Sequence, residues 1–222
     1  MLKASAELRL CADSHEEAVI KRDEYSIIPL AAKDKNIEYI VDIGGNVGCA
    51  SLMFQMNFPN AKIICVEPEG MNMMYAKMNT DNKLIYVEKA VVADEDVKEV
   101  KFNVCHWAGN HHVDGHFRWD LFAPMGSKLD HSIKVPAITL RRIVEENHFP
   151  RIDLLKIDCE GLEGQILQSY KPYMSTVKHF RGEWHGQEDI PLIEDALSAT
   201  HNVWFDRRFS THGDIVADLR HL

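Results

Sequence analysis

Long apolar runs are missing from this sequence. No stretch approaches the ~18 apolar residues that a membrane-spanning helix requires. Residues 1–18 also lack the apolar core of a secretory signal, and the chain shows no repeat, low-complexity segment or flexible linker. We therefore expect one cytoplasmic domain over residues 1–222, with residues 1–35 as a polar lead-in.

Paired cysteines are missing as well. The five cysteines are scattered, and none forms a C-x-x-C pair. This spacing favours reduced, mostly buried thiols over a disulfide framework. The cysteines concerned are Cys11, Cys49, Cys65, Cys105 and Cys159.

Positive charge is scarce relative to negative charge. The chain has 25 Lys and Arg against 34 Asp and Glu, a formal net charge of −9. We therefore expect neither nucleic acid nor an anionic membrane as a partner, although a local basic groove remains open. The 45% hydrophobic and 27% charged content is typical of a globular domain with a full core.

Strand-like and helix-like segments alternate from residue 38 onward, which predicts an α/β domain with a largely parallel sheet. The last two strands are expected to pair antiparallel through a short turn near His212 and Gly213. In one helix, Met71, Met74, Tyr75 and Met78 recur at helical spacing and are expected to pack against the sheet. The strand-like segments are 38–44, 61–67, 83–92, 99–105, 131–139, 152–158, 177–184, 201–206 and 214–220, and the helix-like segments are 47–58, 69–80, 139–148, 162–170 and 191–199.

In the stretch "EYIVDIGGNVGCASLMF" (38–54), three glycines separate a strand-like run from a helix-like run. Glycine permits positive φ and leaves no Cβ beside a ligand. Glu67 follows Gly48 by 19 residues, where a ribose-binding carboxylate belongs. These features indicate a nucleotide cofactor at the carboxyl ends of the strands. Asn46 stands where the dinucleotide fingerprint requires its middle glycine, which favours S-adenosylmethionine. A dinucleotide and a turn without a ligand remain alternatives.

Acidic residues and a histidine follow two later strands. Asp158 ends the strand 152–158 and Glu160 lies in the next turn, while Glu183 and His185 end the strand 177–184. Side chains two apart in a strand share a face, so we predict these four as catalytic residues. Either His185 or a carboxylate could accept a proton from the acceptor, and a divalent cation could also lower its pKa. We predict no metal site.

Each of these residues also has a plainer interpretation. The two acids after strand 152–158 could cap the next helix. The Glu-x-His pair could be an ordinary surface strand end, and Lys156 could neutralise a nearby carboxylate.

A histidine- and aromatic-rich insert spans residues 106–131. We expect it to cover the cofactor site as a lid and to contact the acceptor through His106, Trp107, His111 and His112. A plain surface loop is one alternative. A metal site is another, although the spacing of the histidines matches no specific metal pattern.

Three motifs in order, "VDIGGNVG", "VEPEG" and "IDLLKIDCEGLEGQIL", resemble the FkbM-type family of S-adenosylmethionine-dependent methyltransferases. The resemblance runs roughly from Tyr25 to His185. That family commonly has alanine where Gly45 stands, a small change. The resemblance implies a class I, Rossmann-like methyltransferase fold, whose seven-stranded, mostly parallel sheet has an antiparallel last strand and helices on both faces.

The resemblance also implies a set of cofactor contacts. Tyr25 would fold back over the cofactor, with an ordinary packing role as the alternative. Glu67 would hold the ribose, with Pro68 beside it, and Lys89 and Ala90 would lie by the adenine. Residues at or near the methionine part would be Asp42, Gly44, Gly45, Asn46, Gly48 and Asp158.

The expected activity is O-methylation of a hydroxyl on a sugar or natural-product intermediate. N-methylation of a peptide side-chain amide is an alternative, because no residue separates the two reactions. A nucleotide-binding oxidoreductase and a binding module without catalysis are alternatives from other classes. The acceptor would be a small molecule, glycan or peptide, and the chain a monomer or homodimer.

Overall fold

The computed structural model describes residues 16–105, 111–115, 128–207, 209 and 211–220. Within these ranges, every helix is too short or too polar to cross a lipid bilayer. The helical elements are η1 (Glu16–Lys21), α2 (Ile27–Lys33), α3 (Cys49–Asn57), α4 (Gly70–Asn79), α6 (Leu140–Glu146), α7 (Glu163–Tyr170), η4 (Lys171–Thr176) and α8 (Asp189–Leu197). The strands are β1 (Tyr39–Ile43), β2 (Lys62–Val66), β3 (Ile85–Val87), β4 (Ala90–Val91), β5 (Glu99–Cys105), β6 (His112–Val113), β7 (Leu129–Ile138), β8 (Ile152–Ile157), β9 (Val177–His185), β10 (His201–Phe205) and β11 (His212–Leu219).

A seven-stranded sheet forms the centre of the molecule, in the order β10-β11-β9-β8-β1-β2-β3. Only β11 runs antiparallel to its neighbours β9 and β10, which confirms the predicted fold class. The predicted turn at His212 and Gly213 is wrong, because these residues begin β11 and pair with β9. Strand β1 pairs with β2 on one side and β8 on the other. This reversal of strand order places a ligand crevice beyond β1 and β8.

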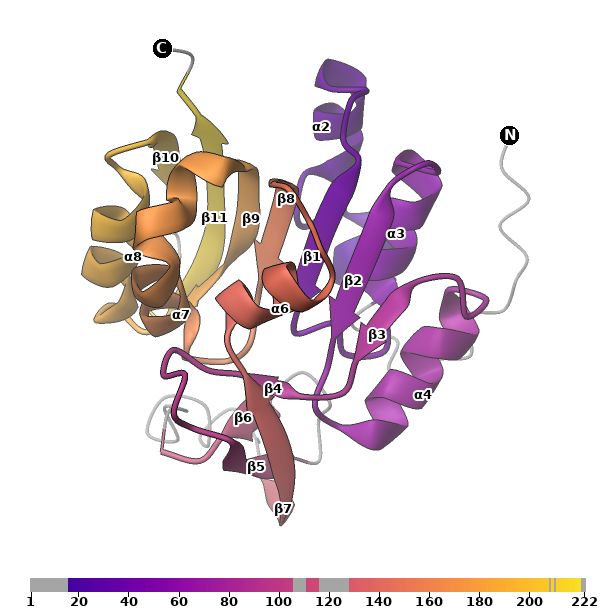
Figure 1. Ribbon diagram of the computed structural model, residues 1–222, viewed down its shortest axis with the longest axis vertical. Coiled ribbons are helices and arrows are strands. Elements are labelled where there is room, and N and C mark those ends of the chain that lie inside the picture. The colour runs from indigo at the N-terminus through magenta and orange to yellow at the C-terminus, as the bar shows by residue number, and fades with distance from the viewer. Residues whose placement is uncertain (1–15, 106–110, 116–127, 208, 210, 221–222) are drawn as a thin grey trace.

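Alternating side chains bury both faces of the central sheet. Ile40 and Ile63 pack in a cluster with residues of α2 and α3, and Val41 and Ile64 pack in a second cluster with residues of α6, α7 and α8. Figure 1 shows these two helical layers on opposite sides of the sheet. Because both faces are covered, β1, β2 and β8 at the centre of the sheet are buried along almost their whole length.

A smaller sheet, in the order β4-β7-β5-β6, lies beyond the carboxyl ends of the central strands (Figure 1). The predicted strand 83–92 is wrong as one element. Its first part is β3 of the central sheet, and its last part is β4, which pairs with β7. Exposed Glu88 and half-buried Lys89 separate the two pieces. An apolar pattern shows that a segment is extended, but not that it changes partner.

The predicted packing of the methionine-rich helix is wrong for three of its four residues. Met71, Met74 and Met78 are 55%, 42% and 39% exposed. Met73 and Ala76, three residues apart, are buried instead. Both sets have helical spacing, so only the neighbours of α4 decide which side faces inward.

The cysteine prediction is confirmed where the structure describes it. Cys49, Cys65 and Cys105 are buried and Cys159 is half-buried, and none of these four described cysteines forms a disulfide. Cys11 lies outside the described residues.

Candidate active site

The glycine turn joins β1 to α3 and lies close against its neighbours. The amides of Gly44 and Gly45 both donate to the carbonyl oxygen of Val66, at 3.1 and 2.9 Å. Gly44 has a φ of 75°, and a Cβ there would lie 1.7 Å from the Asp158 carbonyl oxygen. At Gly48 a Cβ would lie 2.8 Å from a Cα atom of α4. These two glycines therefore let the turn approach β8 and α4, and they do not hold space open for a ligand.

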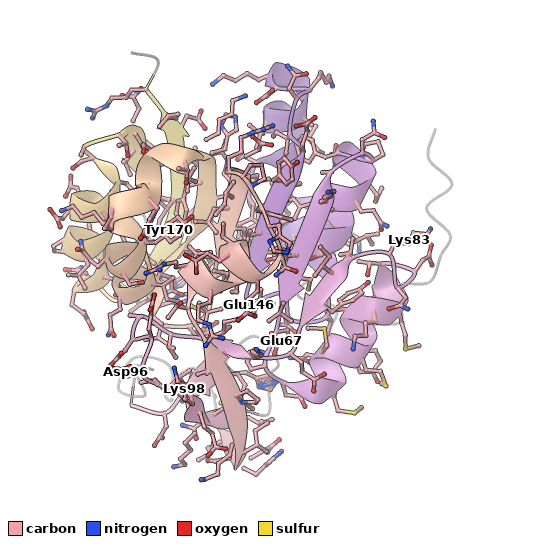
Figure 2. All side chains as sticks on the ribbon, viewed as in Figure 1. Glu67, Lys83, Asp96, Lys98, Glu146 and Tyr170 are labelled. Atoms are coloured by element: carbon pink, nitrogen blue, oxygen red, sulfur yellow. The ribbon has the colours of Figure 1, made fainter. Side chains whose placement is uncertain are left out.

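Above this turn lies a cavity of about 370 Å³, within the usual range for small-molecule sites. It is enclosed by the carboxyl ends of the central strands and by the small sheet. Glu67, at the end of β2, lies between these two parts (Figure 2). The predicted site residues that line the cavity are Gly44, Gly45, Asn46, Glu67, Pro68, Lys89, Ala90, His111, Asp158, Glu160, Glu183 and His185.

Two predicted cofactor residues lie outside the cavity wall. Asp42 is fully buried beneath the turn, where its carboxylate accepts a 2.6 Å hydrogen bond from Ser51 Oγ. Gly48 begins α3 against α4. Both residues support the turn, and neither lines the cavity.

The insert is only partly described. His111 lines the cavity, whereas His112 is buried in the small sheet, 3.1 Å from Asn103 Nδ2. His106 and Trp107 lie outside the described residues. The role of residues 106–131 as a lid therefore stays a prediction.

The lead-in forms one wall of the cavity. Tyr25 Oη donates to Asp158 Oδ2 at 2.8 Å, and its ring centroid lies 5.2 Å from Lys156 Nζ. Glu24 also lines the cavity, where burial and the nearby Glu183 raise its pKa to about 8. Sequence reasoning missed Glu24 because its segment has no strand pattern. Its place beside Tyr25 was the available signal.

Glu67 has the geometry of a ribose-binding carboxylate. It is 4% exposed and accepts hydrogen bonds from the amides of Asn46, at 3.0 Å, and Glu69, at 2.9 Å. Burial raises its pKa to about 7, although these two amides oppose the shift. Each oxygen can accept a second hydrogen bond. Val66 and Val91 supply apolar walls nearby. The carboxylate acceptor and the apolar walls therefore fit a nucleoside whose ribose hydroxyls are free to donate.

His185 lies opposite three carboxylates from two strand ends. Its Nε2 is 3.3 Å from Glu183 Oε2, 3.6 Å from Glu160 Oε2 and 3.9 Å from Asp158 Oδ1. Burial alone would lower the pKa of His185, but Glu160 and Glu163 raise it well above its ordinary value. The neighbouring carboxylates therefore favour the protonated form of His185.

Burial and His185 act in opposite directions on the pKa values of two neighbouring carboxyl groups. Burial raises the pKa of Glu160 well above its usual value, although His185 opposes the shift. Burial also raises the pKa of Glu163, but His185 and the backbone amides that donate to Glu163 together lower it below its ordinary value. Sequence reasoning missed Glu163, although it lies inside the quoted "IDLLKIDCEGLEGQIL" motif.

Lys156 is the cation beneath the turn. Its Nζ lies 3.3 Å from Asp42 Oδ1 and 3.8 Å from Asp158 Oδ2, and it donates to the carbonyl oxygen of Gly44 at 2.7 Å. Burial lowers the pKa of Lys156, but the two carboxylates raise it above its ordinary value. Lys156 therefore neutralises these carboxylates, as the plainer interpretation of the sequence had it.

One group of side chains near the cavity has the composition of a metal site. Ligand atoms of Asp158, Glu183 and His185 all lie within 4.8 Å of one another. Oxygen and imidazole ligands of this kind suit several divalent ions. The sequence led us to predict no metal site, and that stays a prediction.

The comparisons with known proteins agree on the fold. A family model described as the methyltransferase FkbM domain matches residues 21–202, whereas no curated protein matches the chain in sequence. The N-terminal domain of human METTL16 in complex with SAH has a TM-score of 0.51 at 10% identity, covering 90% of this chain and 70% of its own. An rRNA methylase from Streptococcus thermophilus scores 0.53 at 6% identity, with coverages of 88% and 95%. Precorrin-6y C5,15-methyltransferase from Geobacter metallireducens GS-15 scores 0.52 at 11% identity, with coverages of 93% and 92%. At these identities the likeness shows the fold alone.

Proposed function

Because this chain belongs to the FkbM methyltransferase family, we propose that it methylates a hydroxyl of a sugar or natural-product intermediate with S-adenosylmethionine. One observation supports this most directly. The cavity that holds Glu67 at its nucleoside end also holds Asp158, Glu183 and His185. Family membership favours this reading over the oxidoreductase alternative. We do not propose the substrates of the RNA and precorrin enzymes as substrates of this chain.

Different residues of the cavity bind different parts of the cofactor in this proposal. Glu67 accepts the ribose hydroxyls, and Val66 and Ala90 flank the adenine with apolar surface. At the other end, the Asp158 carboxylate suits a cationic group. When bound, S-adenosylmethionine supplies a methyl group on a sulfonium, whose carbon–sulfur electron pair remains on sulfur after transfer.

His185 is the proposed general base. As the acceptor oxygen bonds to the methyl carbon, its hydroxyl proton passes to His185 Nε2. That nitrogen must first be free of a proton, and the surrounding carboxylates raise the pKa of His185 well above its ordinary value. We therefore expect the rate to rise as the pH increases above neutrality, since a larger fraction of His185 is then neutral.

N-methylation remains the second candidate. An amide nitrogen also loses a proton on methylation, so the same base would serve both reactions. A small-molecule, glycan or peptide acceptor fits the proposal, and mass spectrometry of the labelled product would identify the methylated atom.

The first experiment is calorimetric titration of the purified protein with S-adenosylhomocysteine. We expect saturable binding by the wild type and about 10- to 100-fold weaker binding by Glu67→Ala, because hydrogen bonds to a charged group are lost. Glu88→Ala is the matched control, since Glu88 is exposed at the end of the next strand and does not line the cavity. No binding by a folded wild-type protein would refute the proposed function.

A further inference from the structure

Glu163 is fully buried behind the cavity and does not line it. Its Oε1 accepts the amide hydrogen of Cys159 at 2.8 Å, and its Oε2 accepts that of Gly161 at 3.0 Å. The carboxylate therefore cannot rotate without breaking two backbone hydrogen bonds. It lies in a fixed plane at the start of α7.

The same carboxylate reaches His185. Glu163 Oε1 lies 3.1 Å from His185 Nδ1. The two backbone amides would explain a carboxylate that only shapes the turn between β8 and α7. They do not require an imidazole on its other side. An ionised carboxylate at this distance favours a hydrogen on Nδ1, because the charged acceptor strengthens the hydrogen bond.

We propose that Glu163 is a positioning residue, which holds His185 with Nδ1–H against its carboxylate and with Nε2 toward the cavity. This inference rests on the proposed function, in which Nε2 takes the acceptor proton. The hydrogen on Nδ1 stays in place throughout, so Nε2 alone gains and loses a proton. A carboxylate that orients an imidazole in this way fixes which nitrogen is the base.

Other charged groups surround the same ring, and any test has to allow for them. Asp158 and Glu160 follow β8, Glu183 precedes His185 on β9, and Asp189 begins α8. His212 on β11 is paired with His185 in the sheet register. The Glu163 carboxylate lies 3.1 Å from Nδ1. The carboxylates of Asp158, Glu160 and Glu183 lie on the other side of the ring, 3.3–3.9 Å from Nε2.

Nitrogen NMR of the imidazole side chains tests the proposal without a known acceptor. The protein is saturated with S-adenosylhomocysteine, and the His185 signals are assigned by their loss in His185→Gln. Above the pKa of His185, we expect the Nδ1–H tautomer to predominate by at least about tenfold in the wild type. A predominant Nε2–H tautomer in the wild type would overturn the proposal, whether or not any variant folds.

Two variants separate positioning from general structure. Glu163→Gln keeps the size of the side chain but removes its charge, so the tautomer preference should fall severalfold and His185 should lose its proton at a lower pH. Glu194→Gln makes the same chemical change at an exposed position on α8 and should leave both unchanged. An unaltered His185 tautomer in folded Glu163→Gln would also overturn the proposal.

The two proposals fail in different ways. If the proposed function is wrong, the wild type does not bind S-adenosylhomocysteine. If only the present inference is wrong, S-adenosylhomocysteine binds normally but His185 has the Nε2–H tautomer.

Discussion

Gly44 and Gly115 show what positive φ costs at two very different places. Both have left-handed backbones, with φ of 75° and 85°. A Cβ at Gly44 would meet the Asp158 backbone, whereas a Cβ at Gly115 would have no neighbour within 4 Å among the residues that the structure describes. Substitution by alanine at each position therefore separates the energetic cost of backbone strain from the cost of a steric clash.

We expect Gly44→Ala to lower the free energy of unfolding by about 4 kcal/mol or more, because neither backbone segment can move away. Gly115→Ala should cost about 1–2 kcal/mol, the cost of the left-handed conformation alone. Denaturant unfolding of both variants measures the difference. Equal losses would mean that the contact between the turn and β8 is looser than the structure shows.

A second residue-scale prediction concerns Glu67, whose pKa of about 7 lies close to physiological pH. Only the ionised carboxylate can accept both ribose hydroxyls. Below pH 7 we therefore expect the affinity for S-adenosylhomocysteine to weaken by up to about tenfold per pH unit. Glu67→Gln should bind weakly and without this dependence. A flat calorimetric profile for the wild type between pH 6 and about 8 would contradict the assignment of Glu67 to the ribose.

At the scale of elements, β1 and β8 are joined by a buried ion pair as well as by their ladder. Lys156 on β8 lies between Asp42 on β1 and Asp158 after β8, and it also bonds the carbonyl oxygen of Gly44. The parallel register that places Asp42 opposite Lys156 sets this arrangement. The ion pair therefore supports the floor of the cavity.

Removing the buried cation tests this role. We expect Lys156→Met to lower the free energy of unfolding by about 3–5 kcal/mol, because it leaves buried carboxylates unpaired. Lys171→Met is the matched control, since Lys171 pairs with Asp195 at the surface and should change stability little. Thermal unfolding measures both variants. Similar small effects in the two variants would contradict this role of Lys156.

At the scale of the whole molecule, the cavity has walls from distant parts of the chain. The central sheet contributes its strand ends, and the small sheet contributes Phe102 and Val113. The lead-in contributes Ala18, Val19, Glu24 and Tyr25. A ligand that fills the cavity would touch all three. Binding should therefore couple segments that share few contacts with one another.

Hydrogen exchange measures this coupling. With S-adenosylhomocysteine at 100 times its Kd, we expect amide exchange in residues 18–25 and in β5 to slow by up to about 100-fold. Strand β10, at the far edge of the central sheet, should be unaffected and is the internal control. Protection confined to the turn after β1 would mean that the lead-in and small sheet do not close on the ligand.

The sequence by itself determined the alternation of strands and helices, the glycine turn and the acidic residues at the ends of several strands. These features are local: a strand's apolar run, a glycine's freedom and the position of Glu67 after β2 follow from neighbours along the chain. The predictions for the strand 83–92 and for the buried side of the methionine-rich helix were wrong, because an apolar pattern does not show which element a segment packs against. The small sheet separates β4 from β3, and the packing of α4 leaves Met71 exposed.

Only the tertiary structure decided how the candidate site is assembled. Glu24 and Tyr25 reach Asp158 from 133 or more residues away, and Glu163 meets His185 from another element. The same folding placed Asp42 beneath the turn instead of in the cavity wall. Protonation follows from this assembly, because burial and the distances between charges set each pKa. Neither quantity exists until the strand ends have met.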